Sequence, residues 1–394
     1  MTYCLGWKNR NDIFVVADSA VTFTNDSANK LSHTSFGEVT VKCNNTEISE
    51  SITKIHDIDN KLIIGYAGNI DNALKCIEYI RKLVISEGDS IDNALHIISR
   101  YTDIINDVAL IVGFFDSGIA KLCKVEDGNI EFVENLVEIG SIPTSHNFSN
   151  KIRWMINRGS KKFLYDGKIT LTNREILQAI IITAQCYSIK YRLMDYGVGG
   201  VFYGAKLTKE GFYRNENISY MITNKEPQYT NNELAGIDYS DFITTNWIDD
   251  VLVVSSTVLD RPIALFDNFD FETNKYILES LEYNCNEEMF SIKTEQLVLF
   301  NPFTEMITAI DIKKEIYNNF FKLWSKSEND LVHYFFVYNM RIINIINFAQ
   351  FDYEDEVLLN WLLVSPQKYM TRKNFLVSIG AKDKIKDWDD EGYI

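Results

Sequence analysis

The chain has 394 residues, is 46% hydrophobic and carries a formal net charge of −16 at pH 7, which is the composition of a folded globular protein. An acidic surface repels phosphate backbones, so this charge argues against a nucleic-acid partner. The length predicts two domains, or three.

The first predicted element is a β-hairpin. Apolar residues on both sides of the polar turn Lys8–Asp12 predict two strands, the second of which ends on Asp18. We therefore expect Thr2 to be anchored in a sheet, although most chain ends are loose. The next stretch, from Phe23 to Ser51, is rich in Asn, Ser, Thr and Glu, which predicts a hairpin or a long loop.

Two strands and two helices are predicted next. The sequence TKIHDIDNKLIIGYAG predicts strands on either side of the turn Asp57–Asn60. Apolar residues between 73 and 84 recur at a spacing of three or four, as on one face of a helix. The same spacing predicts a second helix from about Ser90 to Ile105.

Strands return between residues 108 and 140, with turn signals at Asp116–Gly118 and at Asp127–Gly128. A helix is predicted near Phe148–Asn157, and a stronger one follows Thr172 and Asn173, which are typical N-cap residues. The Gly-rich sequence DYGVGG then leads into two closing strands.

A domain boundary is predicted near residues 225–236. Beyond it the sequence indicates strands, then helices to the end, and Leu331–Phe348 has the pattern of a buried core helix. The negative charge is concentrated here: residues 1–200 carry 21 basic and 24 acidic side chains, and residues 201–394 carry 18 and 31. No family pattern is evident in this region.

Thr2 is the candidate nucleophile. An aminopeptidase removes the initiator Met when a small residue such as Thr follows, which leaves an α-amine and a hydroxyl on one residue. An α-amine has a pKa of about 7.7–8.0, so near neutral pH much of it is able to accept the hydroxyl proton. This pairing activates Oγ as a nucleophile.

Short motifs in a definite order accompany Thr2. They are ADS at 17–19, Lys54 before a strand, GYAG at 65–68, GS at 140–141 and DYGVGG at 195–200. With the strands between them, they resemble the proteasome β-subunit family, including the HslV-type peptidases, over about residues 2–215. These are N-terminal nucleophile (Ntn) hydrolases, so the resemblance implies an α+β fold, a four-layer αββα sandwich. Residues 216–394 would then form a second, acidic α+β domain.

The resemblance implies a threonine peptidase that hydrolyses peptide bonds through an acyl-enzyme on Thr2. Asp18 matches the acidic residue that pairs with the catalytic lysine. Lys54 matches that lysine, whose charge favours the neutral amine and the deprotonated hydroxyl. Gly68 matches the glycine whose backbone N–H forms the oxyanion hole.

Five more positions match residues around the reacting groups. Ser141 and Asp195 match residues near the N-terminal amine. Thr22 matches a backbone contact to a substrate that binds as an added strand. Tyr66 and Ile70 fall where the family lines the pocket for the residue before the scissile bond, and their bulk predicts a shallow pocket.

The chain departs from the family pattern at several positions. The 23–51 insertion separates Asp18 from Lys54 more than is usual, and it contains Lys30 and Lys42 as rival lysines. Val198 stands where the family usually has a Ser hydroxyl beside the amine, and Ile142 replaces a usual Gly. Two alternatives therefore stay open: an inactive scaffold or binding protein, and an Ntn amidase that acts on a small substrate.

The remaining expectations concern partners and location. The chemistry needs no metal or cofactor, and the five histidines show no pairing for metal or triad work. Family members assemble into rings, so the resemblance implies a homo-oligomer, a ring or a dimer, acting on a peptide or protein substrate. The C-terminal domain is a candidate for capping the site, recruiting a partner or preventing ring stacking. The six cysteines are scattered and no signal peptide or membrane span is evident, which predicts a cytoplasmic protein.

Overall fold

The computed structural model has a mixed α+β fold made mostly of strands in several sheets. The residues that it describes are 2–9, 11–24, 34–38, 42–43, 46–50, 52–101, 105–143, 147–159, 172–223, 228–230, 233–236, 239–248, 250–256, 262–267, 294–302, 306–311 and 341–347. They fall into two compact units. The first contains the described residues up to 215 together with 265–267, and the second contains the others.

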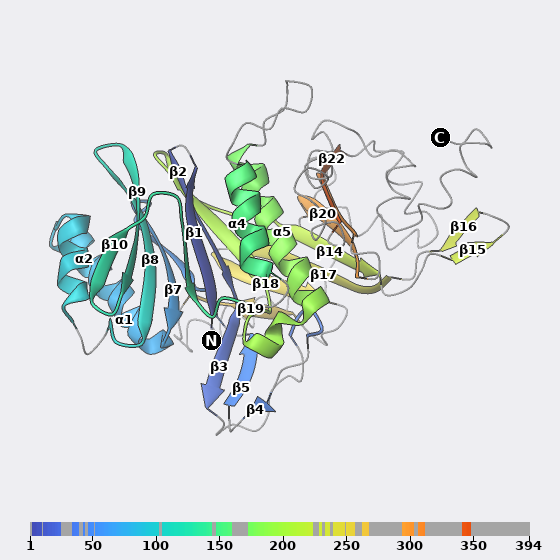
Figure 1. The fold of residues 1–394 in the computed structure, drawn as a ribbon, viewed down its shortest axis with the longest axis horizontal. Coiled ribbons are helices and arrows are strands. Elements are labelled where there is room, and N and C mark those ends of the chain that lie inside the picture. Colours follow the sequence, from blue (N-terminus) through green and yellow to red (C-terminus); the bar gives the residue numbers. More distant parts are fainter. Residues whose placement is uncertain are drawn as a thin grey trace. The chain divides into compact units, whose positions relative to one another are not determined.

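The first sheet of the first unit begins with the predicted hairpin, which the structure confirms (Figure 1). All of its neighbouring strands are antiparallel. Its order is β11-β1-β2-β12-β13. The strands are β1 Tyr3–Asn9, β2 Asp12–Asp18, β11 Leu136–Gly140, β12 Phe202–Thr208 and β13 Gly211–Arg214.

The second sheet has the order β10-β9-β8-β7-β6 and is also antiparallel throughout. Its strands are β6 Ile55–Ile58, β7 Leu62–Gly68, β8 Val108–Asp116, β9 Ile119–Glu126 and β10 Asn129–Phe132. The predicted turns at Asp57–Asn60, Asp116–Gly118 and Asp127–Gly128 join these strands, so the turn signals located the hairpins correctly.

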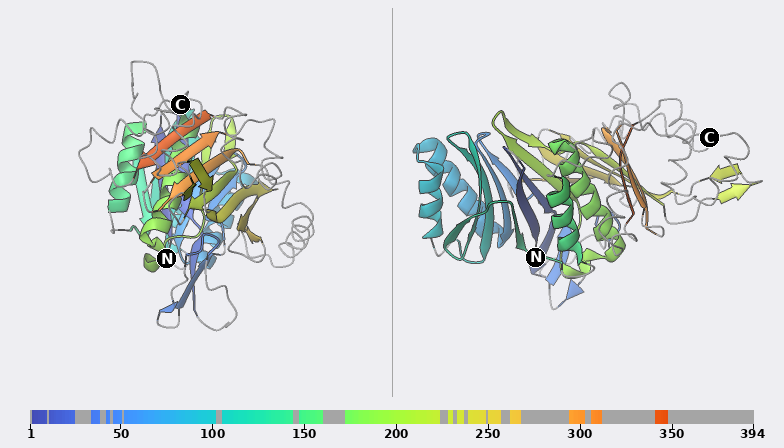
Figure 2. Two further views of the ribbon diagram at one scale, coloured as in Figure 1. Left: turned by 90° about the vertical axis from the view of Figure 1, so that its right-hand side faces the viewer. Right: turned by 45° about the horizontal axis from the view of Figure 1, so that its top comes forward.

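The two sheets face each other (Figure 2). Glycines lie where they meet. A Cβ at Gly65 of β7 would lie 2.5 Å from Cys4 Sγ and 2.8 Å from Val15 Cγ1 of the opposite sheet. A Cβ at Gly6 of β1 would lie 2.6 Å from Ile111 Cγ2. The sheets therefore approach at positions where no side chain fits between them.

Gly65→Ala is expected to lower the free energy of unfolding by about 1–3 kcal/mol, because the added methyl group overpacks this contact. Urea unfolding would measure the loss. Cys4→Ala removes the nearer of the two clashing atoms, so a double-mutant cycle should show that part of the loss is recovered. Strictly additive effects would contradict the expected clash.

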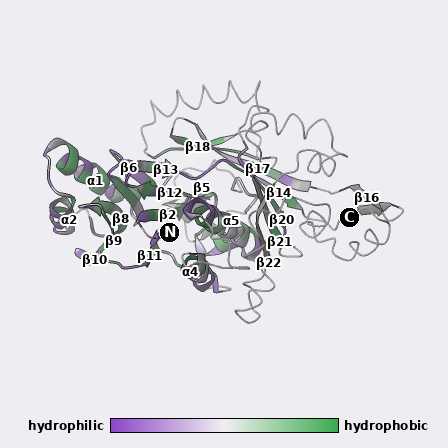
Figure 3. Ribbon diagram, turned by 90° about the horizontal axis from the view of Figure 1, so that it is seen from above, coloured by the Kyte–Doolittle hydropathy of each residue, from purple (hydrophilic) through white to green (hydrophobic). Residues whose placement is uncertain are grey.

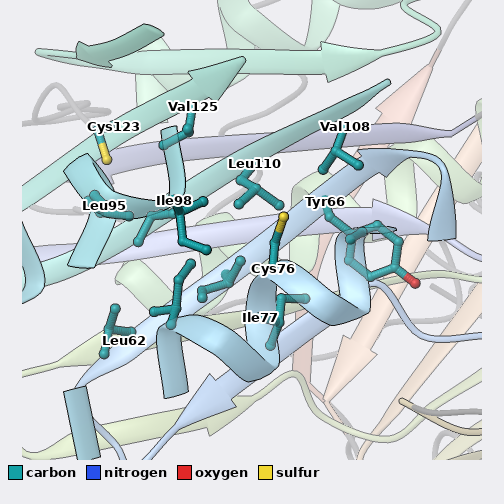
Figure 4. Close-up of a cluster of buried hydrophobic side chains, with 14 of the residues drawn as sticks. Leu62, Tyr66, Cys76, Ile77, Leu95, Ile98, Val108, Leu110, Cys123 and Val125 are labelled. Atoms are coloured by element: carbon teal, nitrogen blue, oxygen red, sulfur yellow. The ribbon is translucent and has the colours of Figure 1, made fainter. Parts of the chain in front are cut away.

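Helices α1 and α2 pack against the second sheet. Helix α1 spans Ile70–Arg81 behind an Asn69 cap, and α2 spans Ile91–Ser99 behind a Ser90 cap. Their apolar faces and the sheet form one hydrophobic cluster, part of which is drawn in Figure 4. Figure 3 shows that both helices also carry hydrophilic residues. The predicted second helix is confirmed, but it is shorter than expected: α2 ends at Ser99, and Ile105 still belongs to the cluster.

Helix α5 (Asn173–Tyr191) packs against β12 and β2 of the first sheet, and helix α4 (Phe148–Gly159) packs against α5. Thr172 caps α5 as predicted, in a capping box with Glu175. Phe148 packs edge-on against Tyr3 of β1 with ring centroids 5.3 Å apart, and it also contacts Tyr187 of α5. Aromatic contacts thus hold this helix pair beside the start of β1.

The 23–51 stretch contributes strands to a small three-stranded sheet. It has the order β3-β5-β4, with the strands β3 Ala20–Thr24, β4 Lys42–Cys43 and β5 Thr46–Glu50. The prediction of a hairpin here is confirmed, since β5 pairs antiparallel with both of the other strands.

The second unit contains a seven-stranded sheet, apart from Leu265 at the end of β19, which is assigned to the first unit. The order is β19-β18-β17-β14-β20-β21-β22, and β14 and β20 are parallel. Its strands are β14 Ile218–Thr223, β17 Tyr239–Ile248, β18 Val251–Ser256, β19 Ile263–Leu265, β20 Gln296–Asn301, β21 Met306–Asp311 and β22 Arg341–Asn347. A separate pair is formed by β15 Gln228–Thr230 and β16 Glu233–Gly236.

The prediction of a core helix over Leu331–Phe348 was wrong for its last part. Residues Arg341–Asn347 form β22 and pair antiparallel with β21. Four isoleucines in seven residues suit a strand, and a short apolar run does not distinguish a strand from a buried helix by periodicity. The rest of that segment, and the helices expected after it, lie outside the described residues. Within the described parts, no helix has the length and apolar character of a membrane span.

Candidate active site

A buried ion pair lies where β2 ends. Lys54 Nζ is 2.8 Å from Asp18 Oδ1, and both side chains are fully buried. Lys54 Nζ also donates to the carbonyl oxygen of Ala20 at 2.5 Å. Burial lowers the pKa of Lys54, and the charge of Asp18 acts against that shift. The backbone N–H of Lys54 donates to the hydroxyl of Tyr203 on β12.

Asp18 joins three segments that are distant in the sequence. Besides the ammonium of Lys54, its carboxylate accepts the N–H of Tyr3 at 3.0 Å and the N–H of Gly199 at 3.0 Å. Tyr3 directly follows Thr2, so the carboxylate holds the backbone at the start of β1. Because its hydrogen bonds come from an ammonium and two amides, a single Asp positions three parts of the site.

Thr2 is 4% exposed and lies beside the end of β11. Its carbonyl oxygen accepts the N–H of Ser141 at 2.6 Å. A Cβ at Gly140 would overlap that same carbonyl and lie 2.9 Å from Ala67 Cβ on β7. Gly140 has a φ of +84°, a backbone conformation that glycine adopts readily. The structure therefore brings Thr2, Ser141 and the last residues of β7 together.

Gly68 ends β7 at an exposed turn before α1. Its φ is +103°, and a Cβ there would overlap the carbonyl oxygen of Asp107. The neighbouring residue, Asn69, donates its N–H to that carbonyl at 2.8 Å and caps α1 with its side chain. Only glycine satisfies both the backbone angle and the close approach here.

The three substrate-binding candidates differ in exposure. Thr22 lies on β3 and is half-buried, where it pairs with Ile48. Tyr66 is fully buried in the hydrophobic cluster (Figure 4). The centroid of its ring is 5.6 Å from that of His56. Ile70 packs against the same cluster and is partly buried. Tyr66 therefore fills space under α1, and the role of these residues in a substrate pocket stays a prediction.

Asp195 and Val198 lie in the segment that leads into the Gly199 turn. Asp195 is exposed in the single turn Leu193–Tyr196, and its carboxylate is paired with Arg192 at 3.4 Å. Val198 is fully buried just before the Gly199 turn. Of the rival lysines, Lys30 lies outside the described residues, and the side chain of Lys42 is likewise not described.

Sequence reasoning missed a second set of carboxylates around the Gly199 turn. Glu38 accepts the N–H of Gly200 at 2.8 Å, and Glu50 accepts the N–H of Val201 at 3.0 Å. Both glutamates come from the 23–51 stretch, whose polar composition indicates only a solvated hairpin or loop. The sole available signal was their position inside an insertion between Asp18 and Lys54.

Comparisons with known proteins found little. No known family profile matches the sequence, and no curated protein matches it. A solved structure, eukaryotic HslV from Trypanosoma brucei, is similar to this chain with a TM-score of 0.33 and 16% sequence identity. The similarity covers 52% of this chain and 99% of that one. A likeness of this size carries no conclusion about fold or activity.

Proposed function

We propose that residues 2–215 form a four-layer αββα Ntn-hydrolase domain, and that it is a threonine peptidase with Thr2 as its nucleophile. One observation carries this proposal: the buried Asp18–Lys54 pair holds the N–H of Tyr3, the residue next to Thr2. A fully buried ion pair is costly to fold around, so its place beside a potential N-terminal nucleophile favours a role in chemistry.

The proposed reaction begins once Met1 has been removed. The α-amine of Thr2 accepts the Oγ proton, and Oγ attacks the carbonyl carbon of the scissile peptide bond. The Lys54 ammonium favours the neutral amine and the deprotonated hydroxyl, and Asp18 orients that ammonium. The N–H of Gly68 stabilises the oxyanion of the tetrahedral intermediate.

Breakdown of the intermediate completes the cycle. The C–N bond breaks and the leaving amine takes the proton from the α-amine of Thr2, which leaves an ester on Oγ. The α-amine then accepts a proton from water as that water attacks the ester, and the proton returns to Oγ as the acid leaves. Ser141 and Thr22 are proposed to contact the amine and the substrate backbone, respectively.

The proposal also covers the substrate, the oligomeric state and the location of the enzyme. It includes a peptide or protein substrate, a homo-oligomer (a ring or a dimer), and a cytoplasmic location. The location is supported by the four cysteines with described side chains, each of which is a free thiol and buried. The second unit is proposed to recruit a protein partner.

The alternative is a catalytically inactive binding protein with the same fold. A specific observation favours it: the exposed carboxylate of Asp195 pairs with Arg192, and position 198 is a valine, which has no hydroxyl. The family that the chain resembles has a Ser hydroxyl beside the amine at the position of Val198, and the valine removes that hydrogen bond.

The intact mass of the purified chain, with and without a peptide epoxyketone, tests the proposal. The reagent needs both the amine and the hydroxyl of an N-terminal Thr, so we expect loss of Met1 and one adduct per chain. Thr2→Ala should lose the adduct, and Thr2→Ser, which keeps a hydroxyl and a small second residue, should retain it. A chain that keeps Met1, or loses it without forming an adduct, would favour the inactive protein.

A further inference from the structure

We propose that Glu38 and Glu50 are positioning residues of the Thr2 site, which hold the Gly199–Val201 turn against Asp18. This inference rests on the proposed function. It assigns a role to the insertion that separates Asp18 from Lys54: the insertion supplies a carboxylate clasp, by which we mean Glu38 and Glu50 together.

Three consecutive backbone N–H groups donate to three different carboxylates. Gly199 N–H donates to Asp18, Gly200 N–H to Glu38 and Val201 N–H to Glu50, at 3.0, 2.8 and 3.0 Å. The Val201 N–H also donates to Ser19 Oγ at 2.8 Å, so Glu50 shares this donor with the hydroxyl that it accepts from. Hydrogen bonds to ionised acceptors are stronger than neutral ones, so the two glutamates fix the turn that contacts Asp18. Asp18 in turn holds Tyr3 and Lys54.

Hydroxyl groups hold the clasp itself in place. Glu38 accepts from Ser188 of α5 at 2.5 Å and from Thr34 at 3.0 Å. Glu50 accepts from Ser35 and from Ser19, the residue after Asp18. The clasp therefore connects the insertion to α5 and to the end of β2, and it has a fixed geometry.

The turn itself is built for this arrangement. Gly200 has a φ of +70°, and a Cβ there would overlap Ser19 Oγ and lie 3.3 Å from Glu50 Oε1. Gln185 of α5 also holds the turn, since it donates to the carbonyl of Gly200 at 2.9 Å and accepts the N–H of Phe202 at 2.8 Å. A side chain at position 200 would therefore push the turn away from Ser19 and Glu50.

The clasp gives the site a dependence on pH. Burial is the main cause that raises the pKa of Glu38 to about 7, with the nearby charge of Glu50 adding to it. Among the described residues near the turn, Asp18 accepts the N–H of Gly199 and pairs with Lys54, and Asp195 pairs with Arg192 in the segment just before it. As pH falls through 7, Glu38 gains a proton and becomes a weaker acceptor for the N–H of Gly200.

The test compares Glu38→Ala, Glu38→Gln and the exposed control Glu131→Ala on β10. The first readout, hydrogen–deuterium exchange of the peptide containing Gly199–Val201, does not depend on activity. At pH 8 we expect about tenfold faster exchange in Glu38→Ala, an intermediate rate in Glu38→Gln and no change in the control. Exchange at the wild-type rate in Glu38→Ala would overturn the proposal.

The second readout is the rate at which the epoxyketone modifies Thr2. We expect it to fall about tenfold in Glu38→Ala, and the ratio of wild type to Glu38→Gln should approach one as pH falls below 7. Titration of the Thr2 amine changes the rate of both proteins equally, so it does not affect the ratio of the two rates. An unchanged rate in Glu38→Ala, despite faster exchange, would reduce the clasp to a purely structural role and overturn the proposal.

Failure of the proposed function has a different signature. The wild-type protein would then form no adduct at any pH, and the clasp would have no catalytic site to position. The exchange readout would still show whether Glu38 holds the turn, so the two failures are separable.

Discussion

Lys54→Met is expected to lower the free energy of unfolding by about 3–5 kcal/mol, one of the two largest effects that we predict. The substitution leaves the carboxylate of Asp18 fully buried without its ammonium partner. The N–H groups of Tyr3 and Gly199 still donate to it, but no positive charge remains to offset its desolvation. Chemical unfolding at pH 7 would measure the loss.

Asp18→Asn should lower the free energy of unfolding by less than Lys54→Met does. Burial already lowers the pKa of Lys54, so an unpaired Lys54 escapes its penalty by losing a proton. The double variant should lose less than the sum of the single losses, because both buried charges are then absent.

An exposed pair supplies the matched control. Lys61 Nζ is 2.6 Å from Asp59 Oδ2, but the two side chains are 57% and 54% exposed. Lys61→Met should therefore change stability by less than about 1 kcal/mol. If Lys54→Met cost no more than Lys61→Met, the buried pair would not be formed in solution.

Glu38→Gln is expected to stabilise the protein at pH 8 by about 3 kcal/mol relative to wild type. The folded state raises the pKa of Glu38 from 4.5 to about 7, so it holds this proton more tightly than the unfolded chain does. The stabilising contribution of the bound proton is complete below pH 4.5 and is lost as pH rises to about 7. Glutamine is neutral at every pH and avoids the loss.

The measurement is the free energy of unfolding of both proteins between pH 4 and pH 8. The two should be similar near pH 4 and diverge up to about pH 7, and the exposed Glu131→Gln should follow wild type throughout. Parallel curves for wild type and Glu38→Gln would contradict the expected burial of this carboxylate. If Glu38→Gln unfolds less readily than wild type but its Thr2 is modified more slowly, then the charge of Glu38 lowers the stability of the protein and supports the Thr2 site.

The sequence by itself determined the local elements of the first unit. The opening hairpin, the cap at Thr172 and the turns between 57 and 128 follow from side-chain chemistry within a few residues. It also indicated that Asp18 would stand at the end of a strand, since alternation and turn residues are local signals.

Only the tertiary structure decided which distant groups meet. The Asp18–Lys54 contact crosses the 23–51 insertion, and Glu38 meets Gly200 from 162 residues away in the sequence. Similarly, the isoleucine-rich segment β22 is a strand because it pairs with β21. The periodicity of its apolar residues does not decide between a strand and a helix. Burial and pairing depend on long-range packing, so the raised pKa of Glu38 was beyond the reach of the sequence.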